Sequence, residues 1–287
     1  MRSTDAGPGQ LQPRRFLPEF ACDTPRHWCG GDPALTHILN AYTLLVPGNE
    51  GYFIRGMKRA LPLLADPCRR RLATEFMQQE GMHGAAHYRY WRVLENQGYR
   101  ISGFRSRTDA FLYKTLEPMT PFKLRLSMIA CVEHINAYIG HEFLAQRILE
   151  PAHPELRALF EWHFAEEIEH KHVTYDLLAA IAPGYALRLL GATMVLPMFY
   201  GLIGLGAICL LWQDRHLFKP GTWWALGRHL FWRDRMVWRT LKHCLAYLRP
   251  GFHPWQLDDA GLAAEVIARY SAPGSARLRE TLATAEI

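Results

Sequence analysis

Apolar residues recur along most of the chain at the three- and four-residue intervals of amphipathic helices. Proline and glycine signals divide this pattern into segments of helical length. They fall at Pro47-Gly48, Asp66-Pro67, Pro118 to Pro121, Pro151 to Pro154 and Pro183-Gly184. Asp32 followed by Pro33 is a favourable helix start, because aspartate caps free amide groups and proline suits the first turn. The sequence has no alternating stretch long enough for a sheet, so we expect an all-α protein.

The pattern divides the chain into three parts. Residues 1–32 are rich in proline and glycine and should form an arm on the surface. Residues 33–185 carry the regular helical pattern expected of a bundle. Residues 186–287 differ, because residues 189–212 lack charge and the segment after them mixes basic with aromatic residues. We expect additional helices there, packed on the bundle or at a membrane.

The uncharged run at 189–212 is long enough to cross a bilayer. The basic and aromatic residues after it, such as Arg228 and Trp232, suit a helix at a membrane interface. Pro197 and Gly201 allow a bent insertion that leaves both flanks in the cytoplasm. The alternative is a long helix buried against the bundle or in a homodimer interface. We expect no nucleic-acid partner, because an apolar run does not help to bind a phosphate backbone.

Composition narrows the class of protein further. Hydrophobic residues make up 49% of the chain and charged residues 21%, which excludes a disordered protein. The six cysteines include no Cys-x-x-Cys pair, so we expect reduced thiols, with a Cys22–Cys29 disulfide as the alternative. The N-terminus lacks the apolar core of a signal peptide. We therefore expect a cytoplasmic protein, held at the inner face of the cytoplasmic membrane if the apolar run inserts.

Two Glu-x-x-His pairs indicate a metal site. Residues three apart lie on one helix face, so each pair can offer an oxygen and a nitrogen to one cation. Another glutamate precedes each pair at the distance of a helical hairpin, which is the ligand pattern of dimetal carboxylate four-helix bundles. The predicted metal ligands are Glu50, Glu80, His83, Glu133, Glu167 and His170.

The four glutamates of this set share their helix faces with apolar residues. Glu50 lies on a stripe with Phe53 and Met57, and Glu133 on one with Ile129. An unpaired charge on such a face costs several kcal/mol or more, and a cation would remove that cost. We expect Glu80 and Glu167 to bridge two metals and to be the catalytic carboxylates, with Glu50 and His83 on one metal and Glu133 and His170 on the other.

Further residues lie near the same faces. His87, His163 and Glu166 are either additional ligands or residues that support the ligands. Glu161, Glu169 and His172 fall on the opposite side of their helix, where we expect exposure to solvent or a supporting role.

Four short motifs resemble the bacterial family described as "predicted metal-dependent hydrolase". They are PGNEGYF at 47–53, QExxH at 79–83 followed by His87, Glu133-His134, and WHxxEEIEHxxVxxD at 162–176. The resemblance covers roughly residues 33–210. One departure is Asn49, where family members more often carry glycine. The resemblance implies a hydrolase, whereas the ligand pattern is similar to that of the ferritin-like superfamily, which implies a four-helix bundle, iron and dioxygen.

Three functions follow from these observations. The one we favour is a non-haem di-iron oxidase or oxygenase, with two iron ions (or manganese) and dioxygen as co-substrate. Its apolar walls predict a hydrophobic, lipid- or polyketide-like substrate, and an electron-donor protein would complete the reaction. The second is a dinuclear metal-dependent hydrolase, in which the metals activate water. The third is a non-catalytic iron-binding protein.

Overall fold

The computed structural model describes residues 11–16, 18–20 and 23–271, and within these ranges the protein is all-α. No strand forms in the described residues; one isolated bridge joins Cys29 and Ala152. The helices of the first two thirds are α1 (Pro33–Ala60), α2 (Pro67–Asn96), α3 (Ser102–Asp109), α4 (Glu117–Met119), α5 (Phe122–Ala145), α6 (Pro154–His170) and α7 (Val173–Ile181). The remaining ones are α8 (Tyr185–Gln213), α9 (Pro220–Gly227), α10 (Met236–Tyr247) and α11 (Ala260–Ser271).

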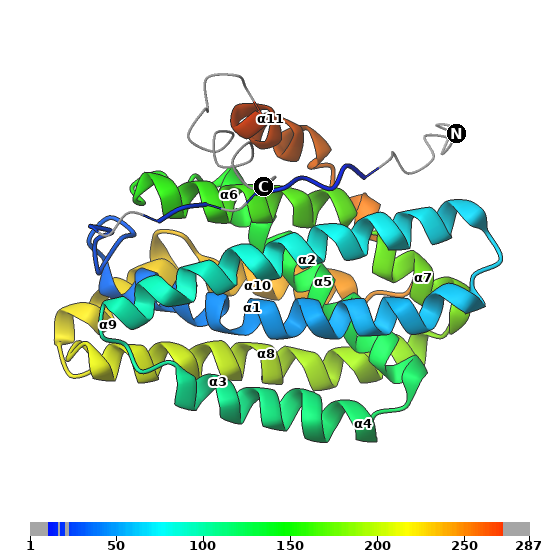
Figure 1. Cartoon of the computed structure of the whole chain (residues 1–287), viewed down its shortest axis with the longest axis horizontal. Coiled ribbons are helices and arrows are strands. Elements are labelled where there is room, and N and C mark those ends of the chain that lie inside the picture. The colour runs from blue at the N-terminus through cyan, green and yellow to red at the C-terminus, as the bar shows by residue number, and fades with distance from the viewer. Residues whose placement is uncertain (1–10, 17, 21–22, 272–287) are drawn as a thin grey trace, which may run out of the picture.

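Four long helices form the bundle as two hairpins. α1 packs against α2, and α5 packs against α6 (Figure 1). α8 lies alongside α1 and α5, and α11 packs on α6. A continuous helical stretch, which includes the π-helical segment Ala110–Leu116, connects the two hairpins. The prediction of a helical bundle with additional C-terminal helices is therefore confirmed.

Most helix starts follow the predicted signals. The side chain of Asp32 accepts hydrogen bonds from the Ala34 and Leu35 amides at 2.8 and 3.1 Å, and Asp66 caps α2 in the same way. The break predicted at Pro47-Gly48 is wrong, because α1 continues through Pro47. A proline inside a helix costs about 3 kcal/mol. The packing of α1 against α2, α5 and α8 offsets that cost.

The described part of the N-terminal arm packs into the fold. Leu11, Phe16 and Trp28 are at most 6% exposed, and Phe16 stacks on Trp162 of α6 with ring centroids 4.6 Å apart. Cys29 is a buried free thiol, and Cys22 lies outside the described residues. The arm thus covers α6 and reaches the bundle interior.

The apolar run predicted at 189–212 lies within α8. α8 is the one helix among the described residues that is long and apolar enough to cross a membrane by length and composition, and 39% of its most apolar stretch is buried. One face packs on α1 and α5, whereas Leu205 and Trp212 are 51% and 65% exposed. The helix is therefore only partly covered by the fold.

Candidate metal centre

The six predicted metal ligands meet in the interior of the bundle. Each is at most 2% exposed. Glu50 comes from α1, the pair Glu80 and His83 from α2, and Glu133 from α5. The pair Glu167 and His170 comes from the last turns of α6. Four helices thus aim carboxylate and imidazole groups at one interior region.

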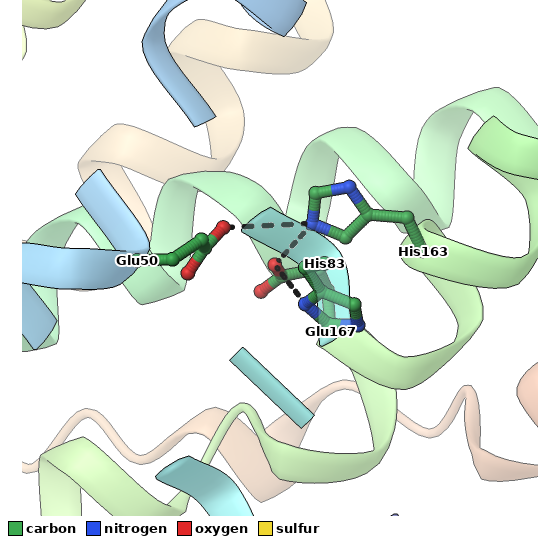
Figure 2. Close-up of side chains that lie close together, drawn as sticks. All are labelled: Glu50, His83, His163 and Glu167. Carbon is green, nitrogen blue, oxygen red and sulfur yellow. Dashed lines mark hydrogen bonds and ion pairs between the residues drawn. The ribbon is translucent and has the colours of Figure 1, made fainter. Parts of the chain in front are cut away.

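One group of donors consists of Glu50, His83, His163 and Glu167, whose ligand atoms all lie within 4.8 Å of one another (Figure 2). His163 Nε2 is 2.7 Å from Glu167 Oε1 and 3.9 Å from Glu50 Oε1. His83 Nδ1 is 3.8 Å from Glu167 Oε1. These separations leave room for one cation between the four side chains.

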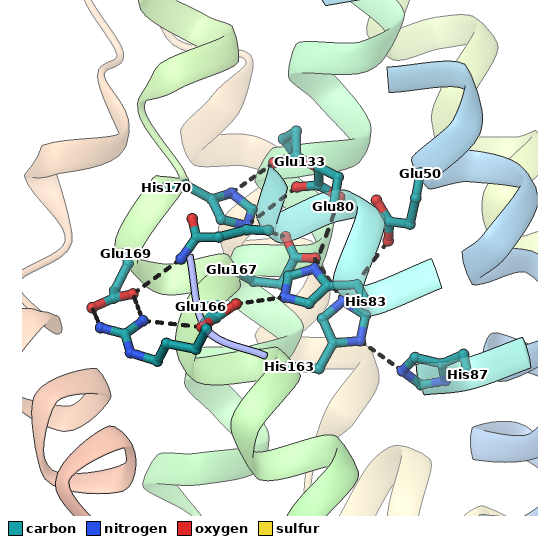
Figure 3. A network of polar contacts seen from close by, with 12 residues as sticks. Glu50, Glu80, His83, His87, Glu133, His163, Glu166, Glu167, Glu169 and His170 are labelled. Carbon is teal, nitrogen blue, oxygen red and sulfur yellow. Dashed lines mark hydrogen bonds and ion pairs between the residues drawn. The ribbon is translucent and has the colours of Figure 1, made fainter. Parts of the chain in front are cut away.

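A second group adjoins the first and consists of Glu80, His83, Glu167 and His170. His170 Nε2 lies 3.2 Å from Glu80 Oε1 and 3.9 Å from Glu167 Oε2. Glu133 Oε2 lies 3.1 Å from the other ring nitrogen of His170 (Figure 3). His83 and Glu167 belong to both groups, so the two groups adjoin, and either could hold a cation.

Several donor atoms in these groups have no hydrogen-bond partner among the described residues. They are both oxygens of Glu50, Glu80 and Glu133, together with Glu167 Oε2, His83 Nδ1 and both nitrogens of His170. His170 Nε2 and Glu80 Oε1 are close, but they are not aligned as a hydrogen bond. More than nine in ten buried polar groups in proteins are paired. Unpaired carboxylate oxygens that converge from four helices fit a bound divalent cation.

The electrostatics of the centre also fit a cation. Burial, reinforced by the negative charge of Glu133, raises the pKa values of Glu50 and Glu167 well above their usual range. Burial also lowers the pKa values of His83 and His163 well below the usual range of histidine. Neutral imidazole is the form that binds metals. A cation would supply the positive charge that the buried carboxylates lack.

A chain of hydrogen bonds begins at Nδ1 of His163, the ring nitrogen that is not next to Glu167. His163 Nδ1 lies 2.8 Å from His87 Nε2, and His87 Nδ1 lies 2.9 Å from the hydroxyl of Thr43. The structure therefore places His163 within a donor group and His87 one contact away from it (Figure 3).

A second chain of contacts supports His83. Glu166 Oε2 is 3.1 Å from His83 Nε2, the ring nitrogen that points away from the two donor groups. The other oxygen of Glu166 accepts a hydrogen bond at 3.0 Å from Arg14, which also binds Glu169 at 2.6 Å. Burial raises the pKa of Glu166 to about 7 although Arg14 lowers it. Glu166 thus contacts a predicted ligand from the side opposite the cation positions.

A protein-family model described as "predicted metal-dependent hydrolase" matches residues 12–258. The chain belongs to this family. The resemblance predicted from four motifs is therefore confirmed, and the match extends beyond the predicted 33–210 at both ends. Comparison with curated proteins and with solved structures gave no match.

Membership of the metal-dependent hydrolase family corrects the favoured sequence prediction. The prediction of a di-iron oxidase or oxygenase is contradicted, because the description of the family as a predicted metal-dependent hydrolase agrees with the alternative. The physical reason for the error is that glutamate and histidine donors serve both oxygen-activating and hydrolytic metal centres. The family and the two buried donor groups support a metal-dependent enzyme.

Some residues around this candidate metal centre gave no usable sequence signal. Arg14 lies in a proline- and glycine-rich arm without helical periodicity, so its contact with Glu166 could not be predicted. Two expectations of solvent exposure are wrong. Glu161 is 5% exposed and accepts a hydrogen bond from Tyr270 at 2.6 Å, and His172 is 1% exposed beside Trp255. Contacts with α11 and the segment before it cover this side of α6.

A further group of potential ligands lies nearer the surface, formed by His27, Asp214 and His216. His27 Nε2 is 2.5 Å from Asp214 Oδ2, and His37 Nε2 is 3.1 Å from the same oxygen. Arg26 Nε lies 2.9 Å from the other oxygen of Asp214 and already compensates its charge. This group is therefore a weaker metal site than the buried pair.

Proposed function

We propose that the protein is a dinuclear metal-dependent hydrolase whose two cations occupy the adjoining donor groups of the bundle. The observation that carries this proposal is the set of buried carboxylate oxygens without partners, arranged around Glu167. Membership of the hydrolase family supports the same reaction class.

In this proposal each cation takes its own ligands and shares one carboxylate. Glu50, His83 and His163 would hold the first cation. Glu80 and His170 would hold the second, with Glu133 at the other ring nitrogen of His170, and Glu167 would lie between the two cations. A carboxylate can bridge because it has two oxygens, whereas His83 Nδ1 can serve only one cation.

When bound, two divalent cations lower the pKa of a coordinated water and polarise the carbonyl or phosphoryl group to be cleaved. The surrounding residues fix the required tautomers. For Nε2 of His163 to bind a cation, Nδ1 must carry the proton and donate a hydrogen bond to His87 Nε2. His87 Nδ1 then donates to the Thr43 hydroxyl. In the same way, His83 Nε2 donates to Glu166, which leaves Nδ1 free to bind.

The donor set bears on the identity of the metals. It combines carboxylates with imidazoles and includes no thiolate, which suits iron, manganese or zinc in the divalent state. Iron or manganese, as predicted from the ligand pattern, remains our proposal for the bound metals. Metal analysis of the purified protein tests it, since zinc as the dominant metal would contradict it.

The test of the reaction class uses protein that is stripped of metal by a chelator and then reloaded. We expect hydrolysis of nitrophenyl acyl esters or phosphoesters in the absence of dioxygen, loss of that activity on chelation, and its return with added metal. Activity that survives complete metal removal would contradict the proposal.

We also propose that the C-terminal helices rest on an anionic membrane surface at the inner face of the cytoplasmic membrane. Trp224, Phe231 and Trp232 form an exposed aromatic cluster, with ring centroids 5.9 Å apart in both of its pairs. Arg228 and Arg233 are exposed beside it in the sequence. Exposed aromatic residues among basic ones suit the headgroup region of an anionic bilayer.

A further inference from the structure

An apolar cavity of about 770 Å³ lies between α8 and the helices α1, α5, α6, α9 and α10. Its walls include Ile38, Phe143, Leu196, Ile203 and Val237. Among the described residues that line it, none is charged. A volume of this size is typical of sites for small organic ligands, which range over roughly 300–1,000 Å³. The walls therefore suit a hydrocarbon rather than a polar or charged ligand.

The inner end of this cavity borders the metal centre. Tyr42 of α1 lines the cavity, and its ring centroid is 6.0 Å from that of His163. Its hydroxyl donates a hydrogen bond to Asn136 at 3.3 Å. The carboxylates Glu167 and Glu50 add to the effect of burial in raising the pKa of Tyr42. Tyr42 thus lines the cavity and also lies beside His163 of the first donor group.

The outer end of the cavity reaches the surface of the described fold. Ile208, Trp223 and Leu241 line it and are 45%, 46% and 47% exposed. Trp223 precedes Trp224 of the exposed aromatic cluster. The mouth therefore lies next to the surface that we assign to the membrane.

We propose that this cavity holds the acyl chain of an ester substrate, with the ester group at Tyr42 and the chain directed toward Trp223. The inference rests on the proposed hydrolase function, since it names the substrate class of that same centre. In the reaction, water adds its hydroxyl group to the acyl carbon and the acyl–oxygen bond breaks. The leaving alcohol takes the remaining proton of the water.

The test measures binding, so it does not depend on activity. The purified full-length protein is titrated with a fluorescent fatty acid, which is then displaced by unlabelled saturated fatty acids of increasing length. Each added methylene should strengthen displacement about threefold to fourfold until the cavity is full. Displacement that does not depend on chain length would overturn the proposal.

Substitutions in α8 and α10 locate the bound chain. Ile203→Trp fills the cavity and should weaken binding at least tenfold. Leu205→Trp is the matched control on the same helix, because Leu205 is exposed and does not line the cavity. Leu241→Trp at the mouth replaces a half-exposed residue, so it tests the same site without disturbing the core, and it too should weaken binding. Equal losses in all three variants, or none in Ile203→Trp and Leu241→Trp, would overturn the proposal.

The same titration on Glu167→Gln separates this inference from the proposed function. That variant should lose metal and hydrolysis, yet keep the dependence of binding on chain length. If the wild type binds acyl chains but shows no metal-dependent hydrolysis, the hydrolase proposal fails while the cavity assignment stands as a binding site. If the wild type hydrolyses short esters but does not bind long acyl chains, only the cavity assignment fails.

Discussion

His163 Nε2 lies 2.7 Å from Glu167 Oε1, one turn along α6, and both side chains are fully buried. The same carboxylate also belongs to the neighbouring donor group with Glu80 and His170. Glu167 is therefore the residue on which the two proposed cation positions depend. Without a metal, the ionised form of Glu167 costs free energy, because burial and the charges of Glu133 and Glu50 raise its pKa.

Glu167→Gln should change stability in opposite directions with and without metal. In the presence of a chelator at neutral pH, the variant should be more stable than the wild type by about 1–3 kcal/mol, because a buried, repelled carboxylate has been removed. With metal present it should be less stable, because a shared ligand is lost. Chemical denaturation in both conditions measures the two differences. Glu150→Gln, at an exposed site, should change stability in neither condition. If Glu167→Gln changes stability in the same direction with and without metal, the ligand assignment is contradicted.

Glu166→Ala should weaken metal binding about tenfold to 100-fold without removing a ligand, because Glu166 orients His83 through its Nε2. Glu169→Ala is the matched control, since Glu169 binds the same Arg14 whereas the carboxylate on His83 Nε2 is that of Glu166. Competition with a fluorescent chelator gives the two affinities. Equal losses in both variants would show that only Arg14 matters.

His229 should make stability depend on pH. It bonds Asp32 at 2.9 Å, and that hydrogen bond, with a second one to Asp234, raises the pKa of His229 although burial opposes it. The stabilisation is therefore complete below the unfolded pKa of about 6.5 and is lost as pH rises through the folded pKa. The difference in unfolding free energy between the wild type and His229→Gln should be larger at pH 6 than at pH 9. An equal difference at both pH values would exclude this linkage.

Exposed arginines near the aromatic cluster should control binding to anionic vesicles. Replacing Arg228 and Arg233 with glutamine should weaken co-sedimentation with phosphatidylglycerol vesicles about tenfold or more, at roughly 1 kcal/mol per basic residue. Replacing Arg69 and Arg71, which are exposed on α2, should have little effect. If neither pair matters, or if the wild type ignores the vesicles, the membrane proposal fails.

The sequence was most informative where one physical rule acted alone. Asp32 and Asp66 before prolines marked helix starts correctly, because capping and proline geometry are local effects. Helical periodicity and hairpin spacing also predicted that the six candidate ligand residues share one interior region, where the structure places them. Pro47 was misread, because the packing of α1 against three neighbouring helices outweighs a local preference.

Other features depend on contacts that no periodicity encodes. Arg14 reaches Glu166 from an irregular arm, and the cavity between α8 and Tyr42 arises from how separate helices pack. His163 could be placed on the correct face, but only the structure shows that its Nε2 faces Glu167. The reaction class was predicted wrongly, because Glu50, His83 and their partners are donors that oxygenases and hydrolases share.

The most direct test of the dinuclear hydrolase is a titration of the metal-free protein with a single divalent metal while ester hydrolysis is measured. The activity should rise to a plateau at two equivalents of metal per chain, and Glu167→Gln should remain inactive at the same metal concentrations. A plateau at one equivalent, or hydrolysis by the metal-free protein, would contradict a centre built from two cations around Glu167.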